Sequence, residues 1–285
     1  MNERTRAFLL LTPALAVIGV LFLGSLVTGL MRSFNYMPSI GLFDPNLDAF
    51  RQVLMSIDFY RSLSQTLYIS LTATVLASCL ALLATLLLRR MSVGKSIALF
   101  LFQLNLAVPH SVGAVGILYL FSQSGVFARL AASTGAIVTP SGFPALVNDP
   151  YSFAIIFEYV WKEVPFISLI LLAKLQSIAE DFESVARTLG ATGYQATRYV
   201  MFPMILPALT GAALVVFAFT FGAFEVPLLL GANYPPVLPV YAYRAFTDVD
   251  LQARPLAMAV TTLITVMSVI AIVLSRNFTK RLMRP

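Results

Sequence analysis

The chain has 285 residues, of which 59% are hydrophobic and only 11% are charged, and its formal net charge is +6. Its mean hydropathy of +0.85 is far above that of soluble globular domains. This composition argues against a soluble protein and predicts a polytopic membrane protein.

Six apolar stretches are long enough to cross a bilayer, since a helical span needs roughly 20 mostly apolar residues. In chain order they are Phe8–Met31, Leu63–Leu88, Ile97–Phe121, Phe153–Leu175, Ile205–Leu230 and Leu256–Leu274. They predict an all-α bundle of six transmembrane helices that forms a single domain over residues 1–285. We interpret the first stretch as an uncleaved anchor, because its apolar run is longer than that of a typical signal peptide.

The positive charge is unevenly distributed. Lysines and arginines are concentrated before the first span, in the second and fourth connectors and after the last span, whereas aspartates accompany the arginines of the other connectors. By the positive-inside rule, this pattern predicts that both termini are cytoplasmic. We therefore interpret the net charge as a topology signal and expect lipid, not nucleic acid, as the surrounding partner.

The sequence lacks the patterns that an intramembrane enzyme or a metal site needs. It contains no H-E-x-x-H and no G-x-S-x-G motif, and its only histidine is His110, next to Pro109. Its only cysteine, Cys79, lies inside the second span and is expected to be a small packing residue. The fragment GKS at residues 94–96 is not a phosphate loop, because Arg89 stands where that motif needs glycine. We predict no catalytic residue, metal site or cofactor in this chain.

The connector between the fourth and fifth spans, residues 176–203, is predicted to form a helix-turn-helix. Its first helix carries an apolar stripe at helical spacing, formed by Ile178, Phe182, Val185, Ala186 and Leu189. Glu183 and Arg187 form an i,i+4 ion pair on the polar side.

The second half of this connector has its own start signal. Gly190 is expected to end the first helix, and Thr192 with Gln195 forms a T-x-x-Q capping box that begins a short helix through about Met201. Pro203 and Pro207 then shape the start of the fifth span. The amphipathic helix could dock into a groove of a cytosolic partner or lie among lipid headgroups, and spacing alone favours neither.

The stretch from Glu183 to Pro207, ESVARTLGATGYQATRYVMFPMILP, resembles the "EAA" loop of type I ATP-binding-cassette importer permeases that depend on a binding protein. Gly190 with the following alanine matches the central glycine of that loop, and Pro203 and Pro207 match its terminal prolines. The segment from Trp161 to Ile178 resembles the span that precedes the loop in this superfamily.

One position departs from the family pattern. The family acid falls at Ser184, whereas Glu183 lies one residue earlier, about 100° away around a helix. Either a serine replaces the acid, or Glu183 reaches the same partner in another rotamer.

The resemblance implies a multi-pass permease of the bacterial inner membrane, closest in appearance to the polyamine, iron and phosphonate branch. It implies three protein partners: a second permease, a cytosolic ATPase dimer that binds ATP and Mg²⁺, and an extracytoplasmic solute-binding protein. The residues expected to contact the ATPase are Glu183, Ala186, Arg187, Gly190, Ala191 and Gly193.

Charged residues inside spans are costly and point to function. Glu158, Lys162 and Glu163 lie in the fourth span and Glu225 lies in the fifth. Glu158 and Lys162 are four residues apart and could simply neutralise each other, and Glu225 could merely line the mouth of the path. We take Glu225, Glu163, Glu158 and His110 as candidates for the substrate path.

The surplus of acids favours a cationic solute such as a polyamine. The alternatives are a permease of the sugar-uptake branch and an ion-coupled secondary transporter that uses the carboxylates as proton relays.

Overall fold

The computed structural model describes residues 2–282, apart from the side chains of residues 3, 4, 177–181 and 274–282, and every regular element in this part of the chain is a helix. Ile178, one member of the predicted apolar stripe, is therefore outside the described side chains.

Within the described residues, five helical segments are long and apolar enough to cross a membrane. They are Thr5–Ser33, Ile57–Arg90, His110–Ser133, Gly193–Gly222 and Leu251–Val273. The predicted fourth span is not among them, although its helix α7 (Phe153–Thr188) has 36 residues. The apolar part of α7 is interrupted by Glu158, Lys162 and Glu163. The total of six spans therefore stays a prediction.

The chain divides into two units. The first unit comprises residues 1–60 and 238–266. It contains α1 (Glu3–Ser33), η1 (Pro38–Ile40), α2 (Asp48–Met55), α11 (Leu238–Phe246), η4 (Leu251–Ala253) and the first part of α12 (Arg254–Leu282). Within it, the rings of Phe34 and Phe50 lie 5.3 Å apart and hold the end of α1 against α2.

The second unit comprises residues 61–237 and 267–285, and it carries the candidate site. Besides α7 it contains most of α3 (Ile57–Arg90), α4 (Lys95–Ala107), α5 (His110–Phe121), α6 (Val126–Ser133), η2 (Pro140–Gly142), α8 (Gly193–Gln195), the π-helical η3 (Ala196–Met201), α9 (Phe202–Gly222) and α10 (Glu225–Leu230).

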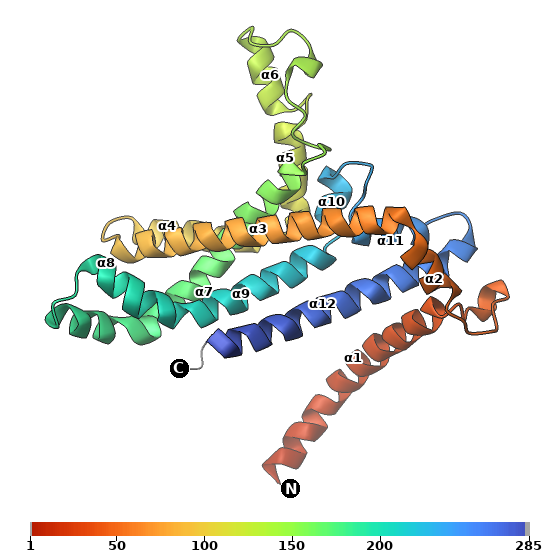
Figure 1. The fold of residues 1–285 in the computed structure, drawn as a ribbon, viewed down its shortest axis with the longest axis horizontal. Coiled ribbons are helices and arrows are strands. Elements are labelled where there is room, and N and C mark those ends of the chain that lie inside the picture. Colours follow the sequence, from red (N-terminus) through yellow and green to blue (C-terminus); the bar gives the residue numbers. More distant parts are fainter. Residues whose placement is uncertain (1, 283–285) are drawn as a thin grey trace. The chain divides into compact units, whose positions relative to one another are not determined.

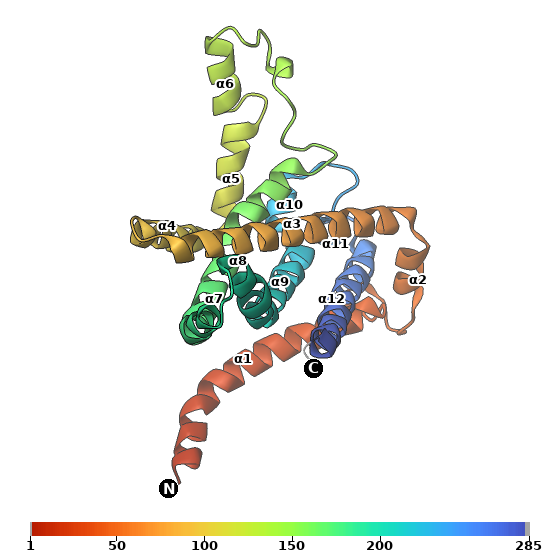
Figure 2. The same cartoon turned by 60° about the vertical axis from the view of Figure 1, so that its left-hand side comes forward.

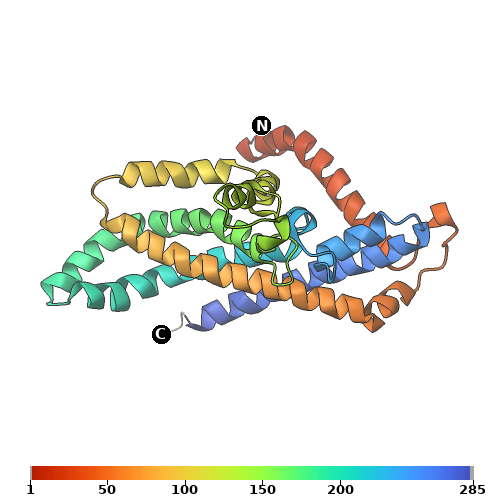
Figure 3. The ribbon, with the colours of Figure 1, turned by 90° about the horizontal axis from the view of Figure 1, so that it is seen from above.

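The core of the second unit lies where α3, α7 and α9 run alongside one another (Figure 3). Its buried members come from all three helices and from η3: Ala77, Ala81, Ile167, Leu171, Leu175, Met201, Ile205, Ala212 and Val216. The alanines of α3 let α7 approach closely, and the hydroxyl of Ser168 on α7 donates to the carbonyl of Ala81 at 3.3 Å.

The predicted third span, Ile97–Phe121, is wrong as a single helix. The α4 helix ends at Ala107, and α5 begins at His110 and turns away from the direction of α4 (Figure 1 and Figure 2). Pro109 has no N–H to continue the hydrogen-bond ladder, and it holds Val108 extended, at φ −78° and ψ 124°.

The predicted fifth span, Ile205–Leu230, is also interrupted. The α9 helix ends at Gly222, Ala223 is extended with ψ 135°, and α10 begins at Glu225. At its other end the helix is longer than expected, because α8, η3 and α9 are continuous from Gly193 onward.

The first helix of the predicted helix-turn-helix is likewise not a separate element. It is the end of α7, which runs without interruption to Thr188 because the sequence between the span and the turn contains neither glycine nor proline. Figure 1 shows the resulting hairpin, in which α7 leads through a short turn into α8 and α9.

Candidate functional site: the coupling turn and an intramembrane polar cluster

The turn at the end of α7 has the hydrogen-bond pattern of a Schellman motif. The N–H of Gly190 donates to the carbonyl of Arg187 at 2.9 Å, and that of Ala191 donates to the carbonyl of Ala186 at 3.0 Å. Gly190 has φ +90°, a left-handed conformation that favours glycine. The prediction that Gly190 ends this helix is confirmed.

The next helix starts as the sequence predicts. The hydroxyl of Thr192 accepts from the backbone N–H of Gln195 at 3.3 Å, and the Gln195 side chain accepts from the backbone N–H of Thr192 at 2.8 Å. This reciprocal capping box orients the chain directly after the turn. Ala191 and Gly193 are half-buried, whereas Gly190 is exposed.

The carboxylate of Glu183 is largely buried and accepts hydrogen bonds from two arginines. Arg187 donates to it at 2.8 Å, which confirms the predicted i,i+4 pair, and Arg89 at the end of α3 also donates to it. Burial acts to raise the pKa of Glu183, but the hydrogen bonds from Arg89 and Arg187 outweigh it and hold the pKa below its usual value. Arg89 also contacts the sulfur of Met201 in η3, so it joins α3 to both arms of the hairpin.

This geometry explains the mismatch at the family acid. The Glu183 side chain is 14% exposed, whereas Ser184, at the position expected for the acid, is exposed. Glu183 therefore faces α3 and not the outer surface of the turn. Sequence reasoning missed Arg89, which is 94 positions away along the chain.

The predicted apolar stripe is exposed where the structure describes it. Phe182, Val185 and Leu189 are 54%, 56% and 83% exposed, and Ala186 is half-buried. Such a stripe is unfavourable in water and requires a covering surface.

A second group of polar residues lies at the break between α4 and α5. The Lys162 ammonium on α7 donates to the backbone carbonyls of Asn105 and Val108. In an unbroken helix, the backbone N–H of residue 109 would donate to the carbonyl of Asn105, and the N–H of Val112 would donate to the carbonyl of Val108. Here residue 109 is a proline without an N–H, and the N–H of Val112 donates to the carbonyl of Pro109 instead. Lys162 thus replaces the hydrogen bonds that the break removes, and its positive charge suits a helix C-terminus.

His110, the first residue of α5, lies between two carboxylates of α7. Its Nδ1 is 3.1 Å from Glu158 Oε1, and its Nε2 is 3.7 Å from Glu163 Oε1. Glu158 is fully buried. Glu158 pairs with His110 and Lys162 donates to carbonyls, so the direct contacts of the two residues are with other groups, and their mutual neutralisation stays a prediction.

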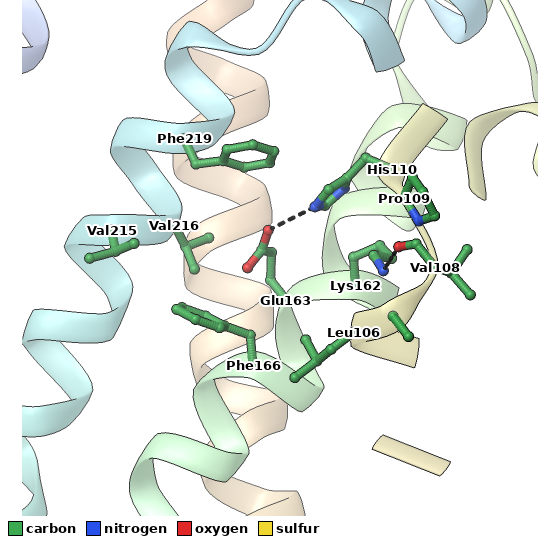
Figure 4. Close-up of a pocket in the computed structure, with 11 residues that line it drawn as sticks. Leu106, Val108, Pro109, His110, Lys162, Glu163, Phe166, Val215, Val216 and Phe219 are labelled. Atoms are coloured by element: carbon green, nitrogen blue, oxygen red, sulfur yellow. Dashed lines mark hydrogen bonds and ion pairs between the residues drawn. The ribbon is translucent and has the colours of Figure 1, made fainter. Parts of the chain in front are cut away.

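This polar cluster opens onto a cavity of about 500 Å³ between the α4–α5 break, α7 and α9. Figure 4 shows the Glu163 carboxylate in it, with one oxygen directed at His110 and with Phe166 and Phe219 on either side. The structure therefore brings together three of the four candidates for the substrate path, Glu158, Glu163 and His110.

Two other predictions fare differently. Glu225 is exposed at the start of α10 and does not line this cavity. Cys79, expected to be a small packing residue, is exposed in this chain, because it lies on the face of α3 opposite Ala77 and Ala81. Among the described residues, no group of three or more His, Cys, Asp or Glu side chains is placed to hold a metal ion.

Comparison with known proteins identifies the family. Residues 73–284 match the model of the binding-protein-dependent transport system inner membrane component. The chain is 29% identical over 200 residues to the probable ABC transporter permease protein y4oQ of Sinorhizobium fredii, covering 68% of this chain and 63% of that protein, just under two thirds of its length. It is 25% identical to the trehalose/maltose transport system permease protein MalF of Thermococcus litoralis, over 82% of this chain and 79% of that protein.

The fold has a close counterpart among solved structures. A chain of a bacterial ABC transporter that imports the acidic polysaccharide alginate superposes with a TM-score of 0.80 at 20% identity, over 99% of this chain and 98% of that chain. With the apolar helices, these similarities identify a multi-pass inner membrane protein. The chain belongs to the family of binding-protein-dependent transport system inner membrane components, the permeases of ABC importers.

Proposed function

We propose that this chain is one half of the membrane path of an ATP-driven importer. It pairs with a second permease, receives a small solute from an extracytoplasmic binding protein and takes up force from a cytosolic ATPase dimer. ATP and Mg²⁺ are bound by that ATPase, and both termini face the cytoplasm. Family membership argues against the alternative of an ion-coupled secondary transporter.

The observation that carries this proposal is the end of α7. The Schellman turn at Gly190 presents an exposed apolar stripe, and the Glu183–Arg89 contact fixes that stripe to α3. An amphipathic helix end of this kind suits a groove on another protein. The residues proposed to contact the ATPase are Ala186, Arg187, Gly190, Ala191 and Gly193, with Glu183 behind them.

A matched pair of glycine substitutions tests the proposal. Gly190→Val and Gly41→Val each place a branched residue at positive φ, +90° and +82°, with nothing within 4 Å of the new Cβ. The local strain is of similar size at both positions, about 1–2 kcal/mol. We expect Gly190→Val to abolish ATPase stimulation by the binding protein and to reduce copurification of the ATPase. Gly41→Val should preserve both, and equal behaviour of the two variants would refute docking at this turn.

The orientation of the chain is tested separately. Alkaline phosphatase fused after Pro285 should be inactive and a fluorescent protein fused there should fluoresce, because only a cytoplasmic C-terminus gives this combination. The opposite pattern would reverse the proposed orientation.

Two classes of solute, cations and sugars, are compatible with these observations. The acids of α7 favour a cation, whereas MalF of Thermococcus litoralis is named for trehalose and maltose. Other relatives are named for thiamine and ferric transport. The relatives thus divide among chemistries, and the choice depends on the site itself.

A further inference from the structure

The cavity between the α4–α5 break, α7 and α9 is large enough for a small molecule. Its volume of about 500 Å³ lies within the range of roughly 300–1,000 Å³ typical of ligand pockets. Its walls belong entirely to the second unit of the chain. The polar groups at its edge determine what it can hold.

Of the three charged groups that α7 places there, two are engaged by other parts of the chain. Lys162 donates to the carbonyls of Asn105 and Val108, and it is 3% exposed. Glu158 is 0% exposed, has both oxygens within 3.4 Å of His110 Nδ1, and does not line the cavity. Glu158 is therefore out of reach of a ligand in the cavity, whereas Lys162 lines the cavity and is held by these two carbonyls.

Glu163 is different, because among the described residues it is the only carboxylate that lines the cavity. Its Oε1 lies 3.7 Å from His110 Nε2, which is longer than a hydrogen bond. Its second oxygen is directed away from His110 in Figure 4, toward Val216 of α9. The cavity therefore presents one carboxyl group, of which one oxygen is directed away from His110.

Apart from Glu163, Lys162 and His110, the walls are apolar and partly aromatic. They are formed by Leu106, Phe166, Val215, Val216 and Phe219, together with the alanine, valine and proline of the break. A carboxylate beside aromatic faces suits a positively charged nitrogen attached to an apolar body, since the nitrogen pairs with the carboxylate and the rings attract cations.

Two other ligand classes fit poorly. A sugar would leave many hydroxyl groups against Phe166, Val215 and Val216 without partners. An inorganic divalent cation needs several oxygen ligands, and the cavity wall offers one carboxylate.

We propose that this cavity binds a small organic cation, with its nitrogen on Glu163 and its apolar body between Phe166 and Phe219. The identification of this ligand as the transported substrate rests on the proposed importer function. The binding of the cation to the cavity does not depend on that function.

The test uses the full chain, purified with its co-expressed partner subunits in lipid nanodiscs. Benzylammonium serves as the cationic probe, benzyl alcohol as its neutral counterpart and trehalose as the sugar probe, and dissociation constants are measured by calorimetry. We expect benzylammonium to bind at least about tenfold more tightly than benzyl alcohol, the ratio that about 1.4 kcal/mol gives. Trehalose should not bind at the cavity.

Matched variants assign the binding to the cavity. Glu163→Gln should remove the preference for the cation, whereas Asp44→Asn, which makes the same charge change at an exposed loop residue, should retain it. Phe219→Leu keeps the wall apolar but removes an aromatic ring, and it should lower the affinity for benzylammonium several-fold. This variant provides the test if Glu163→Gln fails to fold. An unchanged cation preference in Glu163→Gln, or an unchanged benzylammonium affinity in Phe219→Leu, would overturn the proposal, as would Glu163-dependent binding of trehalose.

This experiment separates the two proposals. If the cation preference is absent while Gly190→Val still uncouples the ATPase, the cavity assignment fails and the importer function stands. If the cation preference is present while Gly190→Val behaves as Gly41→Val does, the cavity assignment stands and docking of the ATPase at the turn fails.

Discussion

The carboxylate of Glu183, near the end of α7, is bound by the guanidinium of Arg89 at the end of α3. This contact connects the end of one membrane-spanning helix to the helix that leads into the turn at Gly190. We therefore expect Glu183→Gln to loosen the turn by about 1 kcal/mol, because a charge-assisted hydrogen bond at a partly exposed site is lost. ATPase stimulation by the binding protein should fall several-fold.

A charge exchange distinguishes this positioning role from general destabilisation. The double variant Arg89→Glu with Glu183→Arg should recover part of the lost stimulation, whereas either single reversal should be worse than Glu183→Gln. Arg90→Ala, at the exposed neighbouring arginine, serves as the control. Failure of the double variant to exceed both single reversals would contradict the role.

The same contact should respond to acid. Because the pKa of Glu183 is lowered in the folded turn, its pairing contributes stability above the ordinary glutamate pKa of about 4.3 and loses it as the pH falls through the lowered value. Hydrogen exchange of residues 182–195, corrected for intrinsic rates, should be constant near neutral pH and rise below about pH 4.3. In Glu183→Gln, exchange should be faster throughout and lack the acid-dependent rise; a rise of equal size there would assign it to another group.

Lys162 should be structural and not part of the ligand contact. Lys162→Met leaves the carbonyl of Val108 without its side-chain donor and the carbonyl of Asn105 with only the N–H of Val108, so we expect a loss of about 1–2 kcal/mol. The thermal unfolding midpoint in detergent reports this loss, and Lys95→Met at the start of α4 should change it little. An unchanged midpoint in Lys162→Met would show that the break does not depend on the ammonium.

The close approach of α3 and α7 should tolerate no added volume. Ala81 is fully buried and its carbonyl accepts from Ser168, so Ala81→Leu should cost about 1–3 kcal/mol through overpacking. Leu83→Ala, on the exposed side of the same helix, should cost less than that. Similar unfolding midpoints for the two variants would place the helix contact elsewhere.

The local signals of the coupling turn could be predicted from the sequence, because each depends on residues close together in the chain. Gly190 supplies the left-handed residue that ends α7, and the capping box needs only Thr192 and Gln195. The ion pair of Glu183 with Arg187 also spans a single helical turn.

The polar cluster was only partly predictable, because its contacts join distant segments. The charged residues of α7 could be recognised from the sequence as candidates for the substrate path. The sequence does not show that Lys162 contacts the end of α4 or that His110 lies between Glu158 and Glu163. The break itself had a local signal in Pro109, whose missing N–H ends a helix as readily as it bends one. Hydropathy favoured one continuous span there. The structure has two helices instead, and Lys162 of α7 binds the carbonyls at the break between them.

The uninterrupted course of α7 has a mechanical consequence. Glu163 at the cavity and Glu183 at the turn belong to one helix and lie about 30 Å apart along it, at 1.5 Å per residue. No loop between them can absorb a displacement, and Pro165, close to the cavity, is the one proline inside this helix. A displacement of the turn would therefore be carried to the cavity along one continuous helix, whose only proline lies two residues from the cavity carboxyl group.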